Sequence, residues 1–287
     1  MSNHPNDNPQ DPARRGFVVA AGLAAAATIH AAQDVVERNI DIKTADGTCD
    51  AAFFHPKSGS YPGVLLWPDA FGLRLAMRDM ARRLAADGFS VLVPNPFYRV
   101  SKAPFTTAAG FNFADAADMA KLRPLMASVT APGSGEKDAA AYVAFLDTQK
   151  EVDKARKIGT QGYCMGGPLV MKTAAALPNR IGAGASFHGG GLVTDKPESP
   201  HLLAPKIKAQ LLIAIAGNDD EKQSDAKDKL KETFAAAHLK SEVEVYPGTL
   251  HGWCVPDMPS QNGTSIYNKP EAERAWTQLL ALYRAAL

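Results

Sequence analysis

The chain has 287 residues, 46% of them hydrophobic, and its 31 basic and 30 acidic residues nearly cancel to a formal net charge of +1. Because it contains no basic block and no acidic tail, we expect no nucleic-acid partner and no solvating arm. Its length allows one or two domains with a large buried core. The expected partner is a small, weakly charged or apolar molecule.

The chain contains three cysteines, Cys49, Cys164 and Cys254. An odd number without repeated spacing argues against a disulfide framework and against a zinc site. We expect neither a metal nor an organic cofactor. At least one thiol should be free, either as a small core residue or as a nucleophile.

The N-terminal region resembles an export signal. Residues 1–13 are polar, Arg14 and Arg15 follow, and residues 18–29 form an Ala-rich apolar run. This order is typical of a twin-arginine signal, and the run is shorter than the ~20 residues that a transmembrane helix needs. We therefore predict a signal over residues 1–31 and an exported, periplasmic protein from Ala32 onward, with no membrane contact after signal removal. The alternative is a frayed helix on a cytoplasmic protein.

Beyond the signal, short apolar runs alternate with helical patterns. Asp46 and Gly47 form a typical hairpin turn between two alternating segments. Continuous apolar runs such as residues 63–67 indicate buried strands, and Gly88 ends an amphipathic helical pattern. In chain order we expect strands at 36–43, 48–54 and 63–67, a helix at 75–86, a strand at 89–93, helices at 114–126 and 136–146, a strand at 157–163, a helix at 166–177, strands at 182–187 and 210–216, a helix at 221–237, a strand at 242–246 and a helix at 271–286.

This alternation predicts an α/β fold, with a mostly parallel central sheet covered by helices on both faces. Residues 99–135 are less regular and rich in proline and glycine, and a long insertion of this kind often forms a lid or a pocket wall. Residues 32–287 contain no internal repeat or linker, so one domain is expected.

The strongest local motif is GYCMGG at residues 162–167, directly after a predicted strand and before a predicted helix. The form G-x-C-x-G in this context is typical of the nucleophile elbow of an α/β-hydrolase, with cysteine in place of the more usual serine. The sharp turn leaves no room for Cβ atoms at Gly162 and Gly166 and strains the backbone of Cys164. A buried thiol beside a tight turn is the alternative interpretation.

A thiol nucleophile needs an acid and a base, which follow it along the chain in this fold. Asp219 and Asp220 both follow the strand at 210–216; Asp219 is preferred, and either could instead cap the next helix. His251 lies in the loop after the last strand, where the base belongs. His188 also ends a strand, but it precedes the acid and is interpreted as a pocket or structural residue.

Together these motifs resemble the dienelactone hydrolase family, also called carboxymethylenebutenolidases, from about residue 35 to the C-terminus. The resemblance rests on WPDAFG at 67–72, PNPFYR at 94–99, the elbow at 162–167, Asp219, and YPGTLHG at 246–252.

The resemblance implies several further roles. The backbone N–H groups of Met165 and Ala70 would form the oxyanion hole. Asp69 occupies the position of a family glutamate that contacts the resting thiol and modulates the nucleophile. Arg99 matches one of two arginines that hold a substrate carboxylate, and Val255 replaces the other, which should weaken selection for an anionic lactone.

The expected activity is hydrolysis of a small ester, lactone or thioester through Cys164, Asp219 and His251, with a thioester acyl-enzyme. Phe71, Tyr98 and Trp253, with Phe97, could line an apolar substrate pocket or serve as core aromatics. The alternative function is a non-enzymatic thiol sensor or ligand-binding protein on a hydrolase scaffold, because exposed thiols of low pKa oxidise readily and Cys254 could then act as a resolving thiol. The sequence leaves open the natural substrate and the oligomeric state.

Overall fold

The first two strands form the predicted hairpin. In the computed structural model, which describes residues 33–105, 111–260 and 263–287, β1 (Val35–Thr44) pairs antiparallel with β2 (Gly47–Pro56). Thr44 lies opposite Gly47 at the turn, and the glycine has a φ of 140°, which favours glycine over other residues. The predicted signal at residues 1–31 lies outside the described residues.

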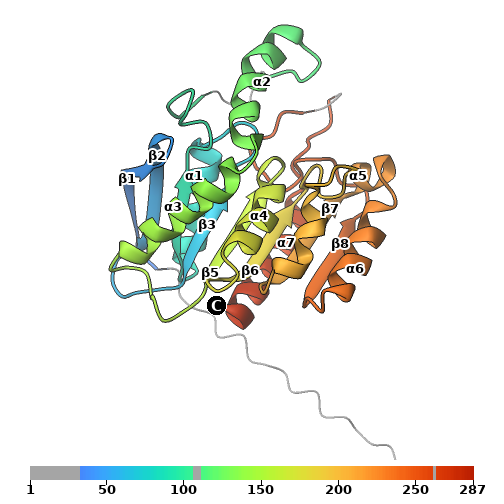
Figure 1. The fold of residues 1–287 in the computed structure, drawn as a ribbon. Helices are drawn as coiled ribbons and strands as arrows, with labels where there is room; N and C mark the ends of the chain where they lie inside the picture. Colours follow the sequence, from blue (N-terminus) through green and yellow to red (C-terminus); the bar gives the residue numbers. More distant parts are fainter. Residues whose placement is uncertain (1–32, 106–110, 261–262) are drawn as a thin grey trace, which may run out of the picture. The chain divides into compact units, whose positions relative to one another are not determined.

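Within the described residues the hairpin continues into an eight-stranded sheet of order β1-β2-β4-β3-β5-β6-β7-β8 (Figure 1). Strand β2 pairs antiparallel with β4, and every later pairing is parallel. The predicted mostly parallel sheet is therefore confirmed. The later strands are β3 (Gly63–Trp67), β4 (Ser90–Pro94), β5 (Ile158–Tyr163), β6 (Ile181–Phe187), β7 (Gln210–Ala216) and β8 (Ser241–Tyr246).

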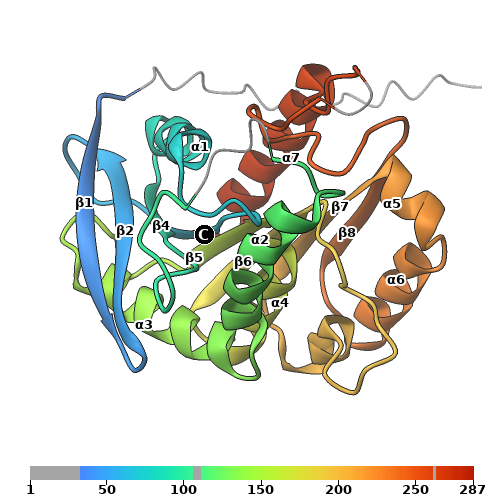
Figure 2. The same ribbon diagram turned by 90° about the horizontal axis from the view of Figure 1, so that it is seen from above.

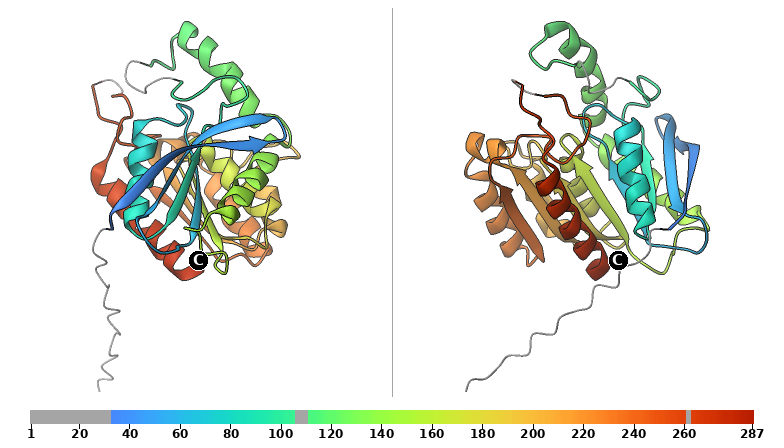
Figure 3. Two further views of the ribbon diagram at one scale, coloured as in Figure 1. Left: turned by 90° about the vertical axis from the view of Figure 1, so that its left-hand side faces the viewer. Right: turned by 180° about the vertical axis from the view of Figure 1, so that it is seen from behind.

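Helices cover both faces of this sheet, as predicted. Helices α1 (Leu75–Ala86) and α7 (Lys269–Ala286) cover one face, which faces the viewer in the right-hand panel of Figure 3. Helices α3 (Ser134–Thr148), α4 (Gly166–Ala176) and α6 (Ala226–Ala236) cover the other. Two buried apolar clusters fill the layers between the sheet and these helices.

The periodicity of α1 explains how a helix attaches to the sheet. Met77, Met80 and Leu84 are spaced by three and four residues and are buried against the strands, as the stripe of an amphipathic helix requires. Arg78 and Arg82 lie on the other side of the helix and bind Glu37 of β1. Burial of the apolar stripe stabilises the helix far more than these exposed ion pairs.

Two expectations for the connections were incomplete. The helix expected at 221–237 is divided into α5 (Gly217–Lys222) and α6, because residues 221–225 (EKQSD) contain no apolar side chain that could anchor a continuous helix to the sheet. A short 3-10 helix, η1 (Pro200–Lys206), was not predicted.

The irregular segment after β4 contains α2 (Ala116–Thr130), whose first turn is capped by the Asp115 carboxylate. The helix rises above the carboxyl ends of the parallel strands (Figure 1), and Figure 2 looks down on this edge of the sheet. Catalytic groups of α/β proteins gather at this edge. No helix among the described residues combines the length and apolarity required to cross a bilayer.

Candidate active site

Cys164 lies in a strained turn between β5 and α4. Its φ is 51°, in the left-handed region that cysteine rarely adopts. A Cβ on Gly162 would lie 2.2 Å from the carbonyl oxygen of Gly166, and one on Gly166 would lie 2.5 Å from that of Trp67. Only glycine fits at these two positions, so the sharp turn that lifts the half-buried thiol above the sheet depends on them.

Asp219 and His251 meet above the ends of β7 and β8. Asp219 belongs to α5, and its Oδ2 lies 2.6 Å from Nδ1 of His251. The backbone N–H of His251 donates to Oδ1 of Asn218 at 2.9 Å, which ties the histidine loop to the helix α5 that carries Asp219. Because the Asp219 carboxylate holds Nδ1, the other ring nitrogen, Nε2, is left free to interact with the Cys164 thiol.

The neighbouring Asp220 has a different partner. Lys227 Nζ donates to both its carboxylate oxygens, at 2.8 and 3.0 Å. The expectation that Asp220 caps the following helix is wrong, because Asp225 occupies the N-cap position of α6. The structure brings Asp219, and not Asp220, to His251.

The protonation of His251 reflects its partners. Burial opposes a charge on the ring, but hydrogen bonds with Asp219 and with the Cys164 thiol outweigh burial and raise the pKa of His251 to about 10. Near neutral pH the ring therefore carries its proton.

Two backbone amides stand beside the thiol without partners. Among the described residues, neither the N–H of Ala70 nor that of Met165 donates a hydrogen bond. Met165 follows Cys164 at the N-cap of α4, and Ala70 lines the same cavity as Cys164. Free N–H groups in such a position are suited to binding a developing oxyanion.

Asp69 is not joined to the thiol by any hydrogen bond in the described part of the chain. Its carboxylate is buried and accepts two hydrogen bonds from Arg74, at 2.7 and 3.0 Å, and a third from the N–H of Phe71 at 2.9 Å. Burial raises the pKa of Asp69, although the adjacent positive charge opposes the shift. Asp69 therefore organises the loop that carries Ala70, and the contact with Cys164 that the resemblance implies stays a prediction.

A cavity of about 1000 Å³ opens above Cys164 and His251. Its lining combines apolar side chains, among them three phenylalanines, with polar and charged ones that include Asn112, Asn218, Lys222 and Ser260. A concave site of this volume is typical of small-molecule binding. Besides the triad candidates, the lining includes Ala70, Phe71, Phe111, Phe113, Met258 and Ile266.

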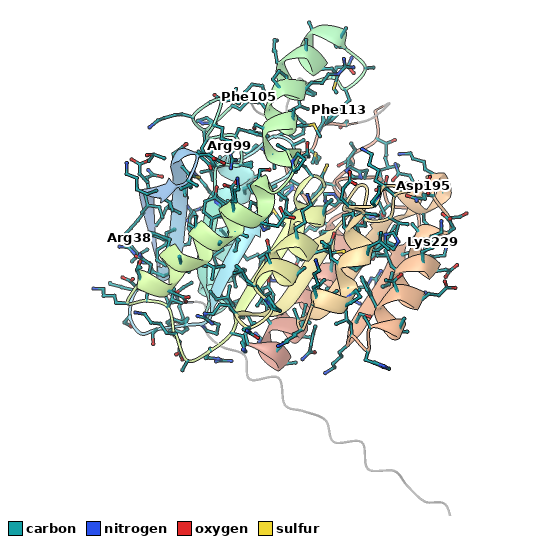
Figure 4. The ribbon with its side chains drawn as sticks, viewed as in Figure 1. Arg38, Arg99, Phe105, Phe113, Asp195 and Lys229 are labelled. Carbon is teal, nitrogen blue, oxygen red and sulfur yellow. The ribbon has the colours of Figure 1, made fainter. Side chains whose placement is uncertain are left out.

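Three residues expected at the substrate are held elsewhere. Arg99 binds Asp46 and Asp138 through charged hydrogen bonds, and Tyr98 donates to Asp138. Figure 4 shows Arg99 above the hairpin strands, on the far side of α2 from Phe113. Trp253 is fully buried in the core. In the described structure none of the three lines the cavity, whereas Phe71 does.

His188 supports the site from below. It is fully buried, and its ring packs edge-on against His251 at a centroid distance of 5.0 Å. Burial, reinforced by the charge of His251, lowers the pKa of His188 well below its ordinary value. A neutral, buried ring that does not line the cavity agrees with the structural interpretation of this residue.

The other two thiols lie in the protein interior. Cys49 lies in β2 of the hairpin and is buried, and burial raises its pKa to about 12. Burial also raises the pKa of Cys254 well above the ordinary value. Neither forms a disulfide, so Cys254 lacks the accessible, acidic thiol that a resolving role requires. Among the described residues, no group of three or more metal-ligating side chains was found.

Several site residues were missed by the sequence reasoning. Arg74 lies five residues after Asp69 but belongs to no recognised motif. Phe111 and Phe113 come from the irregular segment before α2. This segment has no helical or strand periodicity from which the direction of a side chain could be predicted. Their alternation with Asn112 in a proline- and glycine-rich region was the one available signal.

Comparison with known proteins identifies the family. Residues 49–287 match the model of the dienelactone hydrolase family. A carboxymethylenebutenolidase from Rhodococcus opacus is 30% identical over 221 residues, which cover 75% of this chain and 81% of the relative.

Solved structures agree at the level of the fold. A dienelactone hydrolase-like promiscuous phosphotriesterase from metagenomic libraries aligns with a TM-score of 0.69 and 22% identity, covering 88% of this chain and 98% of that one. A dienelactone hydrolase from Anabaena variabilis aligns with a TM-score of 0.62 and 16% identity, covering 88% and 99%. The chain therefore belongs to the dienelactone hydrolase family, a family of α/β-hydrolases that act on ester and lactone bonds.

Proposed function

We propose that this protein hydrolyses a small ester, lactone or thioester, with Cys164 as nucleophile, His251 as base and Asp219 as the acid that orients the base. The observation that carries the proposal is the 2.6 Å contact between His251 Nδ1 and Asp219 Oδ2, beside a cavity that Cys164 also lines. A nucleophile, a base and an orienting acid in this relation are the groups that acyl transfer requires.

In the first half-reaction the Cys164 thiolate attacks the carbonyl carbon, and the π electrons of the C=O bond move onto the oxygen. The N–H groups of Ala70 and Met165 stabilise this oxyanion, an effect of about 3–4 kcal/mol per donor in well-studied enzymes. When the intermediate collapses, the bond to the leaving oxygen or sulfur breaks. The His251 imidazolium then donates its proton to the leaving group, in keeping with its raised pKa.

The second half-reaction releases the acid. His251 is now neutral and takes a proton from a water molecule, whose oxygen attacks the thioester carbon. The oxyanion forms between the same two amides, and its collapse expels the Cys164 thiolate. The products are the carboxylic acid and a regenerated thiolate–imidazolium pair, so each cycle consumes one water molecule and no other co-reactant.

The test is hydrolysis of p-nitrophenyl acetate by the purified protein and two cysteine variants. We expect Cys164→Ala to lose activity with an unchanged circular dichroism spectrum, because the substitution removes only the sulfur. Cys254→Ala is the matched control and should remain active. Mass spectrometry of protein quenched during turnover should find an acetyl group on the peptide that contains Cys164. Full activity of Cys164→Ala would refute the mechanism.

We also propose that residues 1–31 direct export of the folded protein to the periplasm. The support is the order of a polar segment, the Arg14–Arg15 pair and an Ala-rich apolar run. Replacement of both arginines by lysine should leave the uncleaved precursor in the cytoplasm of the bacterium. Unchanged fractionation of the variant, or an intact N-terminus on exported protein, would contradict this assignment.

A further inference from the structure

Three phenylalanines form one wall of the cavity above Cys164. Phe71, Phe111 and Phe113 contact one another edge-to-face, with centroid distances of 5.3, 5.6 and 5.0 Å. Phe71 directly follows Ala70, so this wall begins beside one of the two free amides. If a substrate carbonyl is bound at the Ala70 amide, a substituent on that carbonyl would lie against the aromatic rings.

The outer member of this wall is unusually exposed. Phe113 is 53% exposed, among few large apolar side chains of the described chain with such exposure. It lines the cavity and lies beside α2 (Figure 4). An exposed aromatic ring that lines a concave site gains free energy when a ligand covers it. The wall therefore fits a flat, apolar group of the substrate.

The charges around the cavity do not favour an anion. Arg99 and Arg74 each bind two carboxylates, and no arginine lines the described part of the cavity. Lys222 lines the cavity, but its side chain is 69% exposed and its Nζ already lies 3.5 Å from the Asp219 carboxylate. A substrate carboxylate in the cavity would therefore lack the bidentate partner that an arginine provides.

We propose that the cavity selects an uncharged ester or lactone that carries an aromatic ring, over the carboxylate-bearing lactones that an arginine clamp would hold. This proposal rests on the proposed hydrolysis by Cys164 and names its substrate class. The aromatic wall binds the ring, and the lack of a free guanidinium leaves a substrate carboxylate without a bidentate partner.

Three ethyl esters test the proposal, with acid release followed by pH-stat titration. They are ethyl acetate, ethyl phenylacetate and the 4-carboxylate of ethyl phenylacetate. We expect kcat/KM for ethyl phenylacetate to exceed the other two values by about tenfold, the effect of a well-packed ring face. Equal or better turnover of the carboxylate would overturn the proposal.

A variant pair tests the wall itself. Phe113→Ala should lower kcat/KM for ethyl phenylacetate several-fold and leave that for ethyl acetate within about twofold. Leu202→Ala is the matched control, because Leu202 is 50% exposed on η1 and does not line the cavity; it should change neither value. An equal loss on both esters in Phe113→Ala would overturn the proposal, whereas failure of the wild-type protein to hydrolyse any ester would refute the proposed function as well.

Discussion

Arg74 binds Asp69 through two hydrogen bonds of 2.7 and 3.0 Å, and both side chains are buried. The same guanidinium donates two 2.7 Å hydrogen bonds to Asp257. Asp69 precedes Ala70 of the proposed oxyanion hole, and Asp257 lies in the loop that follows His251. One side chain thereby ties together the two loops that flank the cavity.

The first prediction concerns this bridge. Arg74→Met should lower the free energy of unfolding by about 3–5 kcal/mol, because the Asp69 carboxylate would stay buried without its counter-ion. Asp257→Asn should cost at most about 1 kcal/mol, because the Asp257 carboxylate is 36% exposed. Urea unfolding of both variants measures the difference. Equal losses of unfolding free energy in the two variants would mean that the ion pair of Arg74 with Asp69 does not contribute more to stability than its pair with Asp257.

The second prediction concerns Arg99. Arg99→Met should lower the free energy of unfolding by about 3 kcal/mol, because the buried Asp138 loses both hydrogen bonds from the guanidinium. The KM for an ester with a carboxylate should stay within about twofold of the wild-type value. A selective rise in that KM, without a rise for a neutral ester, would return Arg99 to the role of a substrate clamp.

The third prediction is a titration. Burial lowers the pKa of His251, but hydrogen bonds with Asp219 and Cys164 raise this pKa by more. His251 should therefore stay protonated through the neutral range and lose its proton only as the pH approaches about 10. In Asp219→Asn the carboxylate that favours the charged ring is gone, so the pKa should fall. The ring-proton NMR shifts of His251, assigned by comparison with His251→Gln, follow both changes. A wild-type ring that is neutral at pH 7 would contradict the prediction.

The motif around Cys164, the proposed nucleophile, could be found from the sequence because its causes are local. Gly162 and Gly166 are needed by a turn whose neighbours lie within a few residues, and the apolar run before the turn marks the strand. The hairpin and α1 were predictable for the same reason, since alternation and helical spacing report directly on burial.

The contacts that shape the cavity depend on distant parts of the chain and could not be predicted in this way. Arg74 and Asp257 are separated by 183 positions, and no pattern in either segment refers to the other. Arg99 matches a position of the family pattern, but in the folded chain its guanidinium binds Asp46 and Asp138. These two carboxylates come from the hairpin turn and from α3, and only folding brings them to Arg99.

The last prediction separates two adjacent carboxylates. Asp219 lies 2.6 Å from the His251 ring, whereas Asp220 accepts two hydrogen bonds from Lys227. Asp219→Asn should keep the shape of the site but remove the charge that orients the ring and stabilises the imidazolium. The same substitution in a serine triad lowers the rate by up to about 10⁴-fold. We expect a smaller loss of kcat/KM here, because a thiol ionises more readily than a serine hydroxyl.

Asp220→Asn is the matched control for that measurement. It removes the same charge one residue away and should change kcat/KM by less than about threefold, because its ion pair with Lys227 is partly exposed and contributes at most about 1 kcal/mol to stability. Both variants are assayed on p-nitrophenyl acetate at pH 7 and compared with their urea unfolding curves. Since the two substitutions are chemically identical, a larger loss of kcat/KM in Asp220→Asn would move the acid of the proposed triad by one residue. A loss that followed stability in both variants would show that neither carboxylate acts on the histidine.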